Sequence, residues 1–100
     1  MMLTFIGKED INYMQYSLTL TRKADDSATF GFHFDGTKVG MITKNSPAGR
    51  IGMVQLGDEI LKVNDAKIAS IRDIFDILEK SPLTIDITLR RPRRFFVLTS

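Results

Sequence analysis

The sequence predicts an α+β domain that is mainly β: a five- to six-stranded, partly open antiparallel barrel capped by two helices. Most segments alternate between apolar and polar residues, which is the pattern of a strand with one buried face. Helical signals are confined to two segments, residues 46–52 and 70–80. Strands therefore outnumber helices, and we expect their pairing to be mainly antiparallel.

The N-terminal third predicts a strand followed by a tight hairpin. Residues 16–22 alternate with their apolar side chains on one side, and the polar residues 23–28 predict a loop. A second strand is indicated by three phenylalanines at period two, namely Phe30, Phe32 and Phe34. Asp35-Gly36 follows and is typical of a type I′ turn, because both central positions of that turn need positive φ. We therefore expect an antiparallel hairpin over residues 30–43.

The middle of the chain predicts a short helix and a strand. In residues 46–52, Ser46 can cap the helix, Pro47 suits the first helical position, and the final glycine can end it. Residues 59–64 predict a strand, and a very short one is expected at residues 67–68.

The main helix is predicted over residues 70–80. Ser70 is the expected N-cap, and Asp73 lies three residues on, as in a capping box with Asp in place of Glu. Ser81-Pro82 ends the helix, and residues 83–90 alternate cleanly as the last strand. The apolar positions of the helix are Ile71, Ile74, Phe75, Ile77 and Leu78.

The composition indicates one globular domain and excludes several chemistries. The chain has 100 residues, of which 43% are hydrophobic and 26% charged. The absence of cysteine excludes a disulfide scaffold, a thiolate metal site and a cysteine nucleophile. His33 is the single histidine, and no motif pairs it with a nucleophile. We therefore expect no metal, no cofactor and no enzymatic activity.

The net charge of +2 arises at the C-terminal end. Four of the 14 basic residues cluster there, namely Arg90, Arg91, Arg93 and Arg94. A nucleic-acid-binding domain normally spreads such charge over a face, so nucleic acid is not the expected partner. With Phe95-Phe96 beside it, the cluster leaves an alternative open, which is weak contact with anionic lipid or with nucleic-acid phosphates. A solubilising end is the simpler interpretation.

Residues 16–90 resemble a PDZ domain. Three stretches in the family's order carry the resemblance: Thr29-Phe30-Gly31-Phe32, which is similar to the Gly-Leu-Gly-Phe loop; residues 46–64, which resemble the first helix and the following strand; and residues 70–80, in place of the second helix. The resemblance implies a PDZ domain over residues 15–91, between an N-terminal lead-in of residues 1–14 and a basic, aromatic tail of residues 92–100.

The resemblance also implies a function, which is binding the C-terminal peptide of a partner as an added strand between the second strand and the second helix. Backbone N–H groups would hold the peptide carboxylate in a loop made of Thr29, Phe30, Gly31 and Phe32. Support for the carboxylate would come from Arg22 or Lys23. The groove would be lined by His33, Phe34, Ile71, Phe75 and Leu78.

The start of the main helix determines the expected ligand preference. With Ser70 as N-cap, Ile71 is the first helical residue, which in the family faces the third-from-last ligand residue. An apolar residue there favours a hydrophobic ligand residue, whereas a register that starts at Arg72 or Asp73 would favour a charged one. Ile74 and Ile77 would face the core and leave the other apolar positions to the groove. We therefore expect hydrophobic residues at the last and third-from-last ligand positions.

The expected partners are C-terminal peptides of membrane receptors, channels or signalling proteins. The corresponding location is the cytoplasm, at the inner face of the membrane through those partners. A regulatory peptide-binding domain of a protease is a second alternative, although the strand order fits the ordinary form of the family and not the permuted one.

Overall fold

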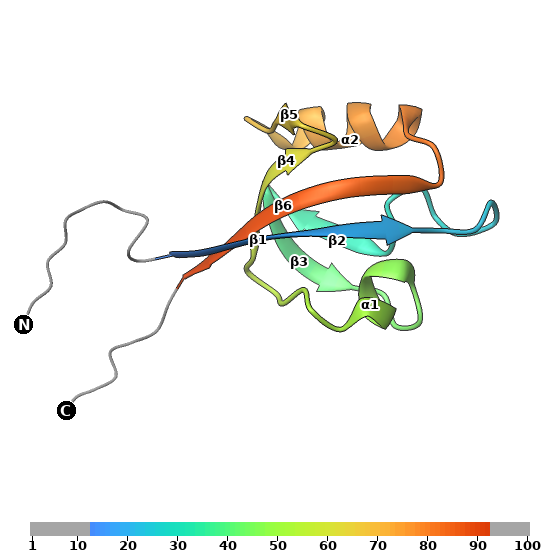
Figure 1. The fold of residues 1–100 in the computed structure, drawn as a ribbon, viewed down its shortest axis with the longest axis horizontal. Helices are drawn as coiled ribbons and strands as arrows, with labels where there is room; N and C mark the ends of the chain where they lie inside the picture. Colours follow the sequence, from blue (N-terminus) through green and yellow to red (C-terminus); the bar gives the residue numbers. More distant parts are fainter. Residues whose placement is uncertain (1–12, 93–100) are drawn as a thin grey trace, which may run out of the picture.

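The computed structural model describes residues 13–92 and contains six strands and two helices. In chain order these are β1 (Tyr13–Thr21), β2 (Phe32–Asp35), β3 (Lys38–Ile42), α1 (Pro47–Ile51), β4 (Glu59–Val63), β5 (Ala66–Lys67), α2 (Ile71–Lys80) and β6 (Thr84–Pro92). The strands form one antiparallel sheet in the order β1-β6-β4-β3-β2, with β5 paired to β4. Figure 1 shows the strands between α2 on one side and α1 on the other. The predicted fold class is confirmed.

The longest pairing joins the first and last strands. β1 and β6 pair without a register shift from Tyr13 opposite Pro92 to Thr21 opposite Thr84. Both strands are longer than expected, because each supplies the hydrogen-bond partners of the other beyond the alternating segment. Tyr13, Met14 and Pro92 therefore lie in strands, although the sequence suggested a lead-in and a tail there. In Figure 1 this end of the pair extends out of the body of the domain.

The β2–β3 hairpin differs from the expected turn. Asp35 pairs with Lys38, so the two central turn residues are Gly36 and Thr37 and not Asp35 and Gly36. Only Gly36 has positive φ, at 62°, as in the first central position of a type II′ turn. The prediction of a type I′ turn was wrong because it took Asp35 out of the strand. A register shift between His33 and Phe34 places one extra residue in β3.

Both helices begin at the predicted caps. Ser46 precedes α1, and its Oγ accepts a hydrogen bond from the Gly49 N–H at 3.1 Å. Ser70 precedes α2, where the Asp73 carboxylate accepts hydrogen bonds from the N–H groups of Ala69 and Ser70. These bonds satisfy donors at the helix start that have no partner within the helix. The register in which Ile71 is the first helical residue is therefore confirmed.

None of the helices in residues 13–92 is long and apolar enough to cross a membrane.

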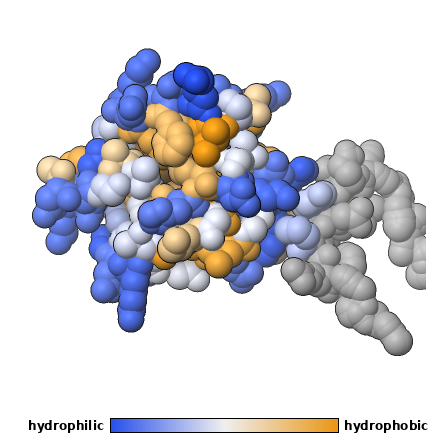
Figure 2. Space-filling model, turned by 180° about the vertical axis from the view of Figure 1, so that it is seen from behind, coloured by the Kyte–Doolittle hydropathy of each residue, from blue (hydrophilic) through white to orange (hydrophobic). Residues whose placement is uncertain are grey.

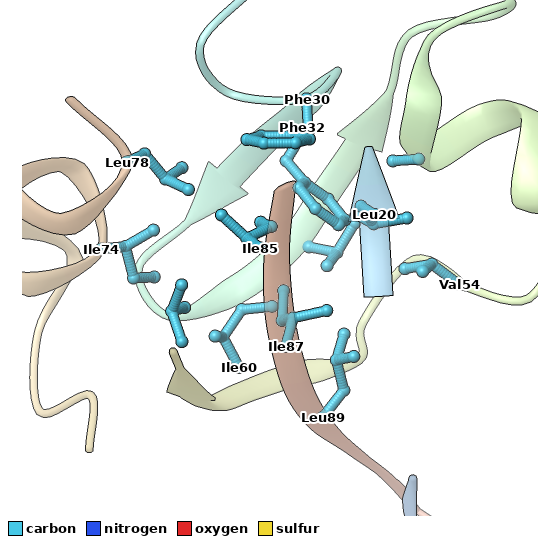
Figure 3. Close-up of a cluster of buried hydrophobic side chains, with 13 residues drawn as sticks. Leu20, Phe30, Phe32, Val54, Ile60, Ile74, Leu78, Ile85, Ile87 and Leu89 are labelled. Carbon is cyan, nitrogen blue, oxygen red and sulfur yellow. The ribbon is translucent and has the colours of Figure 1, made fainter. Parts of the chain in front are cut away.

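The core lies between the sheet and the two helices. Buried side chains from β6, from α2 and from the segment that leads into β2 converge there, as Figure 3 shows. They include Leu20, Phe30, Phe32, Ile60, Ile74, Leu78, Ile85, Ile87 and Leu89. Phe30 and Phe32, from the expected carboxylate-binding loop, are among the largest fully buried side chains. The conformation of this loop is therefore fixed by the core.

Candidate functional site

The segment Thr29–Phe32 forms a tight turn at the start of β2. Phe30 and Gly31 both have positive φ, at 59° and 96°. Positive φ is rare for a bulky residue such as Phe and costs free energy, so the burial of the Phe30 ring offsets that cost. Gly31 has no space for a side chain, since a Cβ atom there would lie 1.9 Å from Ser46 Oγ. The loop is thus packed directly against the N-terminus of α1.

The backbone groups of this turn are mostly used within the domain. The N–H groups of Phe30 and Phe32 donate to the carbonyls of Ser27 and Thr29, each at 3.0 Å. The carbonyls of Phe30 and Gly31 accept from the N–H groups of Ala48 and Thr43. Within the described part of the chain, the Gly31 N–H has no hydrogen-bond acceptor. The Thr29 N–H donates to Ser27 Oγ at 3.2 Å, so one of the four N–H groups of the expected cradle is free and three take part in hydrogen bonds within the domain.

Arg22 lies against the loop, whereas the Lys23 side chain is exposed. The Arg22 guanidinium carbon is 5.5 Å from the centroid of the Phe30 ring, and Nη1 donates to the Asp26 carbonyl at 3.2 Å. Among residues 13–92, Arg22 Nε is the buried side-chain polar atom without a hydrogen-bond partner. Arg22 thus contacts both the β1–β2 loop and the Phe30 ring, and its Nε–H lies beside them as a donor without an acceptor.

Three phenylalanines connect β2 with α2. The rings of Phe32 and Phe34 stack at 5.5 Å between centroids, and Phe34 meets Phe75 edge to face at 5.7 Å. Phe32 is buried, Phe34 is half-buried, and Phe75 is 40% exposed. Burial therefore decreases from the core outwards to α2. On the face opposite to that of Figure 1, a hydrophobic patch lies on the side of the domain where α2 is found (Figure 2).

The burial of α2 differs in part from the expectation. Ile74 and Leu78 are buried, and Ile71 and Ile77 are half-buried. Residues four apart lie one turn apart on the same face of a helix, so Ile74 and Leu78 form the buried stripe. Leu78, which was expected as surplus groove surface, belongs to the buried core, whereas Ile77 packs against the core as expected, although it is only half-buried. Ile71 and Phe75 remain as the partly exposed apolar side chains of the first two turns.

His33 does not join the aromatic residues. Its side chain is exposed, and Nε2 lies 2.9 Å from Thr43 Oγ1 on the other side of the hairpin. His33 and Thr43 also line an open pocket of about 400 Å³ whose other lining residues come from the β1–β2 and β3–α1 loops, Gly31 and Pro47. Phe34, Ile71, Phe75 and Leu78 lie on the α2 side of β2, and His33 is separate from them.

Arg90 and Arg91 are part of the folded domain. Arg90 pairs with Glu59 at 2.8 Å, and its guanidinium carbon lies 4.1 Å from the centroid of the Tyr13 ring. Arg91 donates two hydrogen bonds to the Asp58 carboxylate, at 2.8 and 2.9 Å. The C-terminal arginine cluster thus has two of its four members, Arg90 and Arg91, in internal ion pairs, and Arg93 and Arg94 lie outside the described residues.

Sequence reasoning missed the cluster of Tyr16, Asp58 and Arg91, in which Asp58 is buried and the other two side chains are half-buried. Asp58 is 1% exposed and also accepts hydrogen bonds from the Tyr16 hydroxyl and the Gln55 N–H. Burial opposes ionisation of Asp58, but the hydrogen bonds from Arg91 and Tyr16 outweigh it and lower the pKa of the carboxyl. Burial and the adjacent Asp58 raise the pKa of Tyr16 above its ordinary range. The cluster ties β1 and β6 to the start of β4.

Comparison with solved structures identifies the fold. The N-terminal PDZ domain of InaD, solved with a NorpA C-terminal peptide, superposes with a TM-score of 0.70 at 18% sequence identity, covering 78% of this chain and 97% of that one. The second PDZ domain of Dlg1 from the choanoflagellate Monosiga brevicollis gives 0.68 at 17% identity, covering 76% and 97%. No curated protein sequence matches the chain.

The family follows from the sequence itself. The family model described as PDZ domain matches residues 38–91, which is more than half of the chain. The chain therefore belongs to the PDZ family, whose members are peptide-binding interaction modules and generally not enzymes.

Proposed function

We propose that this PDZ domain binds the C-terminal end of a partner protein as an added strand along β2, in a groove closed by α2. The observation that carries the proposal is the contact between Phe34 of β2 and Phe75 of α2. β2 is the last strand of the sheet order, so one of its edges has unused backbone donors and acceptors. An extended peptide can pair with that edge while its side chains contact the aromatic rings.

The terminal carboxylate would be held at the Thr29–Phe32 turn. The free Gly31 N–H supplies one donor, and the N–H groups of Phe30 and Phe32 become donors when they exchange their turn hydrogen bonds for the ligand. Because Arg22 lies against Phe30, it adds positive charge beside the loop. Lys23 is exposed and can contribute only at longer range.

Two apolar positions define the proposed ligand preference. We place the last ligand side chain over Phe32 and Leu78, which are buried in the core at 2% exposure each, and the third-from-last beside the partly exposed Ile71 and Phe75. Each pair joins a phenylalanine to an aliphatic residue and has no charged member. Burying a hydrophobic ligand side chain there gains free energy in proportion to its apolar area, and a charged side chain would lose its hydration.

We propose as partners the C-terminal ends of membrane receptors, channels or signalling proteins, with the domain in the cytoplasm where such ends are presented. A screen of C-terminal peptides with free carboxylates, each synthesised also as the carboxamide, tests the function. We expect enrichment of hydrophobic residues at the last and third-from-last positions and loss of binding on amidation. No enrichment, or equal binding of acids and amides, would contradict the proposal.

A further inference from the structure

β1 forms the edge of the sheet opposite to the proposed groove. Within residues 13–92 its only strand partner is β6, and no backbone hydrogen bond is made along its other side. The strand is nine residues long, and its Tyr13 end extends out of the body of the domain (Figure 1). A free edge of this length carries a row of backbone donors and acceptors that can pair with another strand.

The β1 edge lacks the features that usually prevent such pairing. Natural edge strands are protected by charged residues, proline, bulges, short length or a covering helix or loop. Of these elements α1 lies near β1, but it makes no backbone hydrogen bond with it. β1 contains no charged residue, no proline and no glycine, and its register with β6 has no shift. β2, at the other edge, has four residues, ends at Asp35 and faces a register shift in β3. The two edges of the sheet therefore differ in their protection.

We propose that two copies of this chain associate through β1, which pairs antiparallel with β1 of the second copy across a two-fold axis at Ser17. In an antiparallel pair, opposed residues carry their side chains on the same face of the sheet, whereas successive residues alternate between faces. A two-fold axis between identical strands therefore lies between the two copies of one residue. Placing it at Ser17, the middle residue of β1, pairs all nine residues.

This register matches side chains on both faces of the joined sheet. On the exposed face Gln15 lies opposite Thr19 of the second copy, and on the core side Tyr16 lies opposite Leu18 of the second copy. Polar side chains thus lie opposite polar ones on the exposed face, and apolar side chains lie opposite apolar ones on the core side. No two charges of one sign are opposed within the new strand pair.

The neighbouring strand brings no like charges together. Arg90 lies opposite Gln15 and Asp86 lies opposite Thr19, so each row of the joined sheet runs from Arg90 of one copy to Asp86 of the other. These two charges are three strand spacings apart, about 14 Å, and Arg90 already pairs with Glu59. The row therefore adds no repulsion and little attraction across the axis.

Association through β1 leaves both peptide grooves accessible. β1 and β2 lie at opposite ends of the strand order, so the two β2 edges face away from the new pairing. A dimer would present two grooves, which strengthens binding to a partner that carries two C-terminal ends.

Single-cysteine variants test the register, because the natural chain has no cysteine. Opposed residues in an antiparallel pair have Cβ atoms about 4.5–5.5 Å apart, close enough for a disulfide after small adjustment. Ser17→Cys should therefore give a covalent dimer under mild oxidation. Gln15→Cys and Thr19→Cys should each remain monomeric, since each residue lies about 13 Å from its own copy at the rise of a strand. Mixed in equal amounts, these two variants should cross-link to each other.

The mass of the unmodified protein in solution is the second readout. Sedimentation at increasing concentration should show a shift from one chain to two, and Ser17→Lys should abolish it by opposing two like charges at the axis. Thr88→Lys is the matched control, since Thr88 lies opposite Ser17 but one strand away from the edge. Thermal unfolding checks that both variants fold. A monomer at every concentration, or cross-linking of all three cysteine variants alike, would overturn the proposal.

Discussion

The ring of Phe34 on β2 meets the ring of Phe75 on α2 edge to face, with 5.7 Å between their centroids. This contact joins the two elements that border the proposed groove, although 40 residues lie between Phe34 and Phe75 in the sequence. Phe75 remains 40% exposed, so the contact stabilises the wall of the groove without closing it.

Replacing Phe75 tests the role of this wall. We expect Phe75→Ala to weaken binding of a hydrophobic C-terminal peptide about tenfold, because ring contacts with Phe34 and with the ligand are lost. The free energy of unfolding should change little, since the side chain is only partly buried. Leu83→Ala is the control, because Leu83 is similarly exposed, at 43%, but lies outside α2. Fluorescence-polarisation titrations would measure both, and equal loss in the two variants would contradict the assignment.

Gly31 should be intolerant of any side chain. Gly31→Ala combines a positive φ with a clash against Ser46 Oγ, and we expect a loss of about 3 kcal/mol in the free energy of unfolding. Gly57→Ala is a matched control, since φ is 91° there but no heavy atom lies within 4 Å of the added Cβ. It should cost about 1 kcal/mol, from the positive φ alone. Urea denaturation measures both values, and equal costs would show that the packing against Ser46 is unimportant.

The first residue of α2 should determine the third-from-last ligand position. In the family a histidine there favours Ser or Thr in the ligand through a hydrogen bond, so Ile71→His should shift the preference from Val to Thr by about 3- to 10-fold. Arg72→His places the same side chain one position later, where it should leave the preference unchanged. Peptides that differ only at this position would show the shift, and a preference for Thr in the natural protein would refute the hydrophobic assignment.

Asp58 should make the free energy of unfolding depend on pH in the acidic range. Its pKa is lower in the folded chain than in the unfolded one, so its stabilising contribution is complete above its ordinary pKa and is lost as the pH falls below that value. Asp58→Asn should cost about 3 kcal/mol at neutral pH, because Arg91 loses its partner, and should flatten the decline of stability between about pH 5 and 2. Asp76→Asn, at an exposed helix position, is the control. An unchanged slope in Asp58→Asn would contradict this role.

Local sequence signals were sufficient to predict the order of helices and strands and the residues at which the helices begin. Ser46 Oγ accepts from the Gly49 N–H, and the Asp73 carboxylate accepts from the Ser70 N–H, each three residues away, so both caps can be predicted from neighbouring residues. The type of the turn at Gly36 could not be predicted from the sequence. It depends on how β2 pairs with β3, and that pairing shifts by one residue between His33 and Phe34.

Long-range features of the site were not predictable from the sequence pattern. The ion pair between Asp58 and Arg91 joins residues 33 positions apart, and nothing in either local sequence indicates it. Likewise, the internal hydrogen bonds of the Thr29–Phe32 turn depend on Ser27 and on the start of α1. The resemblance placed the loop and α2 correctly in the chain but could not show which N–H groups are free.

The most direct test of the proposed function is the amide resonance of Gly31 in NMR titrations with two peptides. The peptides share a hydrophobic C-terminal sequence and differ only in ending as the carboxylate or as the carboxamide. We expect the carboxylate peptide to shift the Gly31 N–H and the amides of β2 and α2, and the carboxamide to leave them in place. Equal shifts with both peptides, or shifts confined to residues away from β2 and α2, would contradict recognition of a C-terminal end in this groove.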